Sequence, residues 1–409
     1  MKKNLIYFSL AFAAMAMATS CSDDDPASGS GLASKTYSQE TLALTYNGEP
    51  LVGKTASFNV TSSGNAEITL AGENLDLSEY LGELPALSGV PTTIQTCGAL
   101  PGSASFTLPV KLSGSETECS FSGSSESEYC TFSYEGTVTG ETMTLDLKDV
   151  KLKDTTMADA TVSLTGSWTV PAFDYNFYND LRVNWVSEKG IELFGPGYET
   201  PVASVVGLAL MMMPVYDNMG LGDALPALLK EVTFGEDGNI RAKYVDTKSE
   251  SKETVSSPAN IAQYIVAGDK ILIYLNPQAV IVNTLKNTRG EDLSEVVKTL
   301  LSAILPMATN GIPLNYGAAI SNPDDNGKVS YFDYPETMSV YLGTETLKPL
   351  LSAIMPLLQD DNMKKAIIEM ATLTPGYEEM GGMLEIILNA LPEVVEKSSV
   401  IEIGINLKR

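Results

Sequence analysis

The chain has 409 residues, 44% of them hydrophobic, and a formal net charge of -25. This is too long for one ordinary domain and apolar enough for folded cores, so we expect a globular protein of about two domains. The charge disfavours nucleic acid and anionic lipid headgroups as partners. The chain has no histidine, which excludes Ser-His-Asp and Cys-His mechanisms and removes the commonest zinc ligand.

The first 20 residues resemble the signal peptide of a bacterial lipoprotein. Lys2 and Lys3 precede an apolar stretch, and the box Ala-Thr-Ser-Cys ends at Cys21. The resemblance implies cleavage before Cys21 and a diacylglyceryl group on its thiol. The Ser-Asp-Asp-Asp run that follows resembles the surface-export signal of Bacteroidota lipoproteins. We therefore expect a signal peptide over 1–20 and a mature chain that is lipid-anchored to the outer membrane and exposed at the surface. The alternative is an ordinary secretory signal with a stray cysteine.

Residues 21–36 are rich in Ser, Asp, Gly and Pro and predict a flexible tether. From 37 to 170 the pattern predicts an all-β domain, either a barrel or a sandwich. Strand-like runs recur about every 8 to 12 residues, with Gly, Asn and Ser between them. The run over 160–170 is expected to be a long strand that closes this domain.

Three cysteines lie in this region. Cys119 and Cys130 flank a serine-rich segment that can bring two strand ends together, and an exported protein permits a disulfide. A disulfide between them and a pair of free thiols are the two alternatives. Cys97 is expected to be a buried thiol.

From Pro171 the composition changes, and residues 171–409 form the second predicted domain. Its centre is the stretch 230–277, in which two antiparallel strand pairs follow one another. Asp237-Gly238 supplies the positive φ that the first hairpin turn needs. Around this stretch, apolar periodicity predicts helices over 202–213, 223–230, 292–307, 346–370 and 377–397, and strands over 181–186, 190–194, 312–316, 329–332, 338–342 and 400–407. The first two of these strands are expected to form a hairpin.

Three stretches, 232–240, 268–275 and 311–316 with 338–342, resemble the lipocalin-like and calycin-like domains of Bacteroidota lipoproteins. The resemblance covers roughly 172–409. It implies an antiparallel β-barrel decorated with helices, and the wider family binds small apolar ligands. The fold class expected for the whole chain is mainly β with α insertions (α+β).

Five residues are candidate ligand contacts. Tyr175, Tyr178 and Trp185 belong to an aromatic cluster, and aromatic faces can stack on sugar rings. Trp185 fits equally well as a core residue of its strand. Met211 and Met212 end an apolar helical segment, where methionine suits a ligand mouth and also core filling.

No short constellation of carboxylates indicates catalysis. The acidic run 324–328 lacks the spacing and distal glutamate of an EF-hand loop, so a polar turn is favoured there. We therefore expect a non-enzymatic protein, without cofactor or metal, that buries a small apolar or amphipathic ligand at the mouth of its second domain. The alternative is a surface module that binds glycans or another protein. An open barrel interior would favour the first hypothesis and a filled interior the second.

Overall fold

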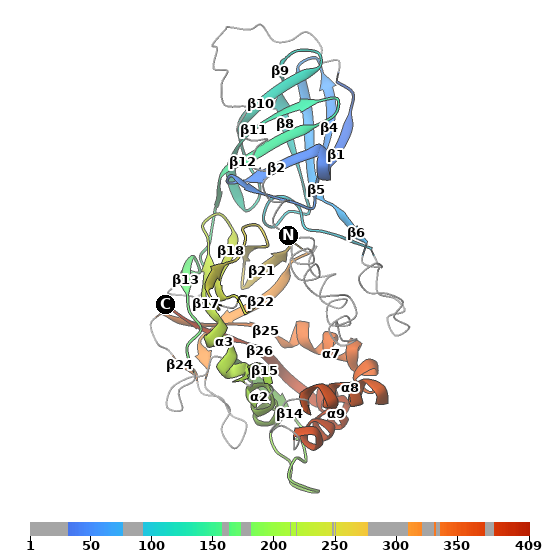
Figure 1. Ribbon diagram of the computed structural model, residues 1–409, viewed down its shortest axis with the longest axis vertical. Helices are drawn as coiled ribbons and strands as arrows, with labels where there is room; N and C mark the ends of the chain where they lie inside the picture. Colours follow the sequence, from blue (N-terminus) through green and yellow to red (C-terminus); the bar gives the residue numbers. More distant parts are fainter. Residues whose placement is uncertain are drawn as a thin grey trace.

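The computed structural model describes residues 32–76, 93–157, 163–172, 181–212, 214–217, 219–247, 249, 251–276, 310–320, 331–332, 336–372 and 380–409. Over these ranges the chain is mainly β with helical insertions, and it forms two domains stacked along the long axis of the molecule (Figure 1). Outside the described residues lie the predicted signal peptide with Cys21, the candidates Tyr175 and Tyr178, the helix over 292–307 and the acidic run 324–328.

The first domain is a sandwich of two sheets with strand orders β1-β4-β5-β8 and β3-β2-β12-β11-β10-β9. All paired strands are antiparallel except β2 and β12, which run parallel. Buried and exposed residues alternate along the strands, so each sheet turns one face to a shared core. The bounds are β1 (Lys35–Ser38), β2 (Leu42–Tyr46), β3 (Glu49–Pro50), β4 (Lys54–Ser62), β5 (Asn65–Gly72), β8 (Ser105–Lys111), β9 (Ser113–Gly114), β10 (Glu118–Glu126), β11 (Cys130–Thr139) and β12 (Met143–Leu152); a small ribbon is formed by β6 (Asn74–Asp76) and β7 (Thr93–Gln95), and a 3-10 turn, η1 (Gln39–Thr41), precedes β2.

The second domain is built on one curled antiparallel sheet with the order β13-β17-β18-β20-β21-β22-β25-β26-β14, and β19 adds to β18. The two hairpins expected in 230–277 are confirmed as β17–β18 and β20–β21. The bounds are β13 (Gly166–Trp168), β14 (Leu181–Ser187), β17 (Leu229–Phe234), β18 (Asn239–Val245), β19 (Thr254–Ser256), β20 (Ala262–Ala267), β21 (Lys270–Leu275), β22 (Ile312–Gly317), β25 (Thr337–Leu342) and β26 (Ser398–Lys408); two small ribbons pair β15 (Pro214–Tyr216) with β16 (Met219–Gly220) and β23 (Ala319–Ile320) with β24 (Tyr331–Phe332).

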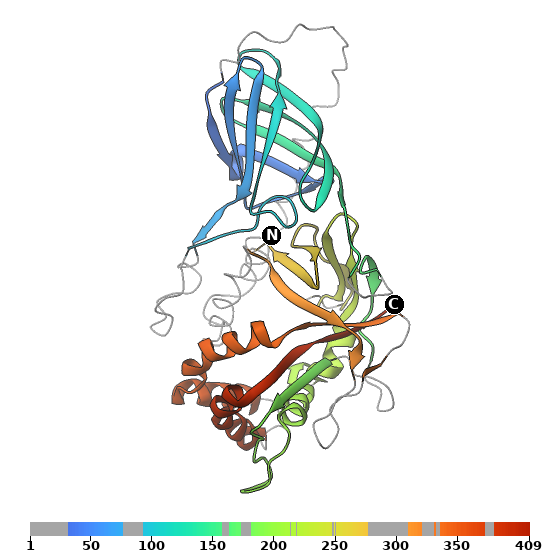
Figure 2. The same cartoon turned by 180° about the vertical axis from the view of Figure 1, so that it is seen from behind.

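Most of the described helices gather around β14 and β26, at the end of the curled sheet that lies away from the first domain (Figure 2), whereas the helix over 221–228 lies beside β17 and β18. The helices are α2 (Val202–Met212), α3 (Leu221–Leu228), α7 (Thr344–Leu358), α8 (Asp361–Thr372) and α9 (Met380–Lys397). The helix expected over 346–370 is two helices, because Asp360 accepts backbone hydrogen bonds from Asn362 and Met363 and so caps α8. No helix in the described ranges is long and apolar enough to cross a membrane.

Two strands pair with partners other than the expected ones. Within 163–172 only Gly166–Trp168 is a strand, and it pairs with β17, so the strand expected to close the first domain belongs to the second sheet. The segment 190–194 was expected to form a hairpin with 181–186. Instead β14 pairs along its whole length with β26, and Ile191 makes a single bridge to Thr200.

The first strand of the curled sheet is also joined to β26. The amide of Thr169, next to β13, donates to the carbonyl of Lys408 at 2.7 Å, and the amide of Lys408 donates back to the carbonyl of Thr169 at 2.9 Å. A single bridge beside β13 therefore links the first strand of the curled sheet to β26.

The two domains share one buried core. The Tyr46 hydroxyl of the first domain donates to the carbonyl of Asp237 in the second at 2.5 Å. In the other direction, the side-chain amide of Asn260 donates to the carbonyl of Pro50 at 3.0 Å. Buried apolar residues of β20 and β21, including Tyr264, belong to the same cluster as the core of the first domain. The domains are thus packed together as well as connected through the chain.

Candidate functional site

The outer face of the six-stranded sheet in the first domain is lined by hydroxyl and carboxylate side chains. Every second residue of its central strands points into the core, and the residues between them point outward. We call this surface the hydroxyl face and define it by Thr45, Ser113, Ser120, Ser122, Ser124, Thr131, Ser133, Glu135, Thr137, Thr144 and Asp146.

The strand register arranges these side chains in rows across the sheet. Ser120 of β10 lies opposite Thr137 of β11, which in turn lies opposite Thr144 of β12. The next row places Glu135 beside Asp146. Short side chains dominate these rows, so the face is recessed where bulky residues would fill it.

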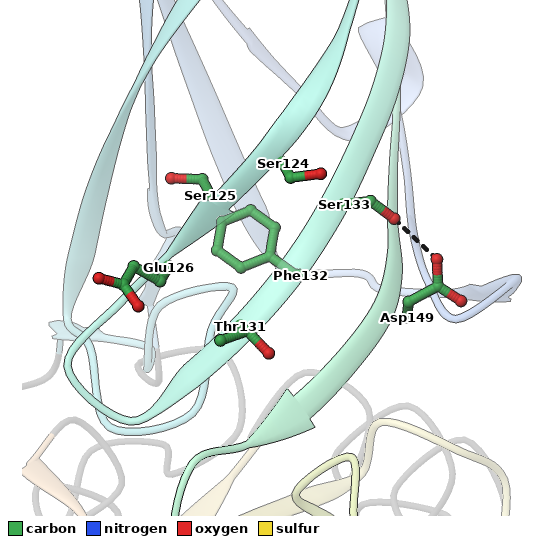
Figure 3. A pocket seen from close by; sticks show the side chains of 7 residues that line it. All are labelled: Ser124, Ser125, Glu126, Thr131, Phe132, Ser133 and Asp149. Atoms are coloured by element: carbon green, nitrogen blue, oxygen red, sulfur yellow. Dashed lines mark hydrogen bonds between the residues drawn. The ribbon is translucent and has the colours of Figure 1, made fainter.

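Two adjacent cavities open on the hydroxyl face, and both are open to solvent, the first of them as a shallow depression. The first has a volume of about 620 Å³ and is lined by Ser124, Ser125, Glu126, Thr131, Phe132, Ser133 and Asp149. In Figure 3 the Phe132 ring lies between the serines of β10 and Ser133, and the Ser133 hydroxyl points to Asp149 at 2.8 Å. The second has a volume of about 680 Å³ and is lined by Ala43, Thr45, Lys111, Ser113, Ser120, Phe121, Ser122, Glu135, Gly136, Thr137, Thr144, Leu145 and Asp146.

Hydrogen bonds within the second cavity orient its carboxylates. The Thr45 hydroxyl donates to Oδ1 of Asp146 at 2.6 Å. Lys148 donates to Glu135, and its Nζ lies 4.0 Å from Oδ2 of Asp146. The hydrogen bond to Glu135 raises the pKa of Lys148, so this amine is protonated at neutral pH. The carboxylates are held in place and keep further lone pairs for a ligand.

A cross-strand pair of threonines forms the floor between β11 and β12. The hydroxyls of Thr137 and Thr144 lie 2.8 Å apart, and the amide of Thr137 donates to the Thr144 oxygen at 3.0 Å. Each hydroxyl can both donate and accept. Among the described residues, no group of three or more acidic or cysteine side chains is arranged to hold a metal ion.

The candidates predicted from the sequence lie elsewhere. Trp185 is only 4% exposed, packs in the core under α2 and α9, and donates from its indole to the Ser398 hydroxyl at 2.6 Å. This packing is that of the core alternative for Trp185, and its contact with a ligand stays a prediction. Met211 and Met212 lie in the last turn of α2, and their side chains, like Tyr175 and Tyr178, are outside what the structure describes.

Of the two alternatives for Cys119 and Cys130, the structure has the pair of free thiols, and both are buried. The register pairs Cys119 with Val138, at the far end of β11 from Cys130, which is much too far for a disulfide. The Cys119 thiol donates to the carbonyl of Ser115 at 3.2 Å, and Cys130 hydrogen-bonds the Ser127 hydroxyl at the same distance. Burial raises the pKa of both thiols.

One face of the curled sheet in the second domain is apolar from strand to strand. The register sets Tyr264 opposite Ile273, Ile271 opposite Leu314 and Tyr316 opposite Val340. The face is filled near β13 and β20, where Trp168 and Tyr264 are 0% exposed. Along β22 its side chains, from Ile312 to Tyr316, are only partly buried.

The hydroxyl face had one signal in the sequence, the alternation of serine with other residues from Ser120 to Ser124. That alternation predicts an exposed strand face, but it does not indicate which strands lie beside this one in the sheet. No family model matches the chain, and no match was found among curated proteins or solved structures. The assignment of a function therefore depends on the geometry of the two surfaces.

Proposed function

We propose that this is a non-enzymatic binding protein and that its hydroxyl face takes a neutral glycan. The observation that carries the proposal is the pair of adjacent cavities, of about 620 and 680 Å³, lined by hydroxyls and carboxylates on neighbouring strands. A sugar ring presents several hydroxyls that must each donate or accept when they leave water. Serine and threonine can do both, and carboxylates accept strongly.

The charge of the two cavities sets the ligand class. Their lining includes four carboxylates, Glu126, Glu135, Asp146 and Asp149, against one lining lysine, Lys111, with Lys148 beside the second cavity. Sulfated glycans and uronic acids would be repelled by this surplus of negative charge. Neutral sugars carry no charge and are not repelled by this surface.

The rigidity of the site supports binding. The lining residues stand on strands whose register is continuous across β10, β11 and β12, so their positions are set before a ligand arrives. We further propose, from the sequence alone, that Cys21 is lipidated and that the domain works at the outer surface of a bacterial outer membrane. A neutral glycan is a ligand that such a surface meets.

The test starts from a glycan array probed with the full chain carrying Cys21→Ala, followed by titration calorimetry of the best neutral ligand. Thr137→Val with Thr144→Val keeps the shape of the floor and removes two hydroxyls. We expect this double variant to weaken binding by at least about tenfold, since each hydrogen bond to a ligand is worth about 1 kcal/mol.

The chain offers a matched control on its other sheet. Thr69 and Thr107 form the same kind of cross-strand pair, with hydroxyls 2.9 Å apart, on β5 and β8. Replacing both by valine should leave the affinity unchanged. Equal affinity of the two double variants would remove the hydroxyl face from consideration.

A second candidate function follows from the apolar face of the curled sheet. We propose that a lipocalin-like second domain also takes a small apolar or amphipathic ligand beside β22, where Leu314 and Tyr316 are only partly buried. Native mass spectrometry of the same full chain should then show an added mass that is lost on denaturation. A bare polypeptide mass after incubation with a fatty-acid mixture would count against this candidate.

A further inference from the structure

The loop between β14 and α2 presents two aromatic side chains to solvent. Phe194 is 76% exposed and Tyr198 is 73% exposed, the highest values for large hydrophobic residues in the described part of the chain. Between them stands the sequence Gly-Pro-Gly. We call Leu193 to Tyr198 the aromatic tip; it contains no charged residue.

The tip is held by its own hydrogen bonds. At its base, Ile191 and Thr200 exchange two backbone hydrogen bonds of 2.9 Å each. Within it, the amide of Tyr198 donates to the carbonyl of Gly195 at 3.2 Å. Gly195 and Gly197 have φ angles of +119° and +83°, which other residues rarely adopt. The two aromatic side chains are therefore presented by a defined turn.

The tip lies at an extremity of the molecule. Both views of the ribbon show this green loop projecting beyond the helices, at the end away from the first domain (Figures 1 and 2). Of its charged neighbours, Lys189 pairs with Glu199 at 2.6 Å at the base, and the Glu192 carboxylate accepts a hydrogen bond from the amide of Gly197 at 3.2 Å. In the described ranges, every other large apolar side chain is less exposed than Phe194 and Tyr198.

We propose that the aromatic tip inserts into the interfacial region of a zwitterionic lipid bilayer. Phenylalanine brings apolar area, and tyrosine combines an apolar ring with a hydroxyl that remains hydrated, a combination found at membrane interfaces. Two side chains on a narrow loop are far less than the roughly 1,000 Å² that a specific protein interface needs. A bilayer, in contrast, needs no matching surface.

Charge decides between lipid classes. Glu192 and Glu199 flank the tip, and the whole chain carries -25. Anionic headgroups would therefore oppose the contact, whereas zwitterionic headgroups would not. This inference concerns a different surface from the hydroxyl face and is independent of the proposed glycan binding.

The test uses the chain from Ser22 onward, without the predicted signal peptide and Cys21, so that neither an apolar leader nor an acyl chain contributes. The probe is Phe194→Trp, mixed with phosphatidylcholine vesicles. The two native tryptophans, Trp168 and Trp185, are 0% and 4% exposed and give a constant background. We expect the emission to shift to shorter wavelength on vesicle addition. The control Tyr244→Trp, on β18 at a residue that is 38% exposed, should show no shift.

Flotation with the same vesicles supplies the second measurement. The parent chain should float, and Phe194→Ser with Tyr198→Ser should reduce the bound fraction at least about tenfold through the lost apolar burial. The proposal is overturned if the parent chain does not float, if the double variant floats equally well, or if phosphatidylglycerol strengthens binding. Sedimentation analysis tests whether the tip instead binds a second copy of the chain. Self-association that the double variant abolishes would show this and would also overturn the proposal.

Discussion

Three buried tyrosines test whether the two domains unfold as one unit. Each donates its hydroxyl to a backbone carbonyl, but at a different place in the molecule. Tyr37 donates to Thr139 at 2.5 Å within the first domain, and Tyr264 donates to Gly235 at 2.9 Å within the second. Tyr46 donates to Asp237 at 2.5 Å across the domain junction. Replacing each by phenylalanine removes one oxygen atom and keeps the ring.

The size of the effect follows from the burial of these rings. Tyr37 and Tyr46 are 1% exposed and Tyr264 is 0% exposed, so water does not readily replace the lost donor. Desolvation raises the pKa of Tyr46 well above its usual value, so its hydroxyl keeps the proton that it donates. The loss of one such hydrogen bond costs about 1 to 2 kcal/mol of unfolding free energy.

The assay is urea unfolding followed by fluorescence and circular dichroism. Because one buried cluster spans both domains, we expect a single transition in which all three variants lose a similar amount of stability. Independent domains would give a different result. Tyr37→Phe would then shift one transition, Tyr264→Phe another, and Tyr46→Phe would shift neither, which would refute the shared core.

Three further predictions follow from single sites. Gly404→Ala should cost about 1 to 3 kcal/mol in urea unfolding, because the added Cβ would lie 2.1 Å from the carbonyl oxygen of Val340; Gly382→Ala, with open space around it, should cost nothing, and equal effects would contradict the packing. The three described thiols should react with a thiol reagent only after unfolding, and a reductant should leave the melting temperature unchanged. The hydrogen bond from Lys270 lowers the pKa of Glu345 from 4.5 to about 2, so the pair stabilises the fold above pH 4.5 and this stabilisation is lost as the pH falls through about 2. Lys270→Met should therefore flatten acid unfolding between these values, and an unchanged acid profile would count against the pair.

Local signals in the sequence predict local structure well. The Asp237-Gly238 turn is present, and Gly238 has the positive φ, +77°, that the hairpin was expected to need. The strand pairs β4–β5 and β11–β12 follow the same rule, since in each a short turn joins strands of alternating pattern. These features depend only on residues that are close in the chain.

Pairing over long distances was not predictable in the same way. Trp168 was assigned to the first domain by its place in the sequence, but its strand pairs with Val232 and its neighbour Thr169 bonds to Lys408. The partner of Trp185 is Ser398, more than two hundred residues away. Period-two patterns say which residues share a face and not which strands are neighbours.

The same limit explains why the candidate site was missed. The hydroxyl face depends on β2 lying parallel to β12, which sets Thr45 beside Asp146 although they are about a hundred residues apart. Aromatic residues were predicted as ligand contacts because a single ring can stack on a ligand whatever its neighbours are. A row of small hydroxyls becomes a site only when the strands that carry it are placed side by side.

The most direct test of the account is a crystal structure of the full chain carrying Cys21→Ala with a neutral oligosaccharide selected on the array. We expect the sugar in the two cavities of the hydroxyl face, with its hydroxyls within hydrogen-bond distance of Thr144, Glu135 or Ser124. An oligosaccharide bound on the apolar face beside β22, or anywhere else outside the two cavities, would contradict the central claim.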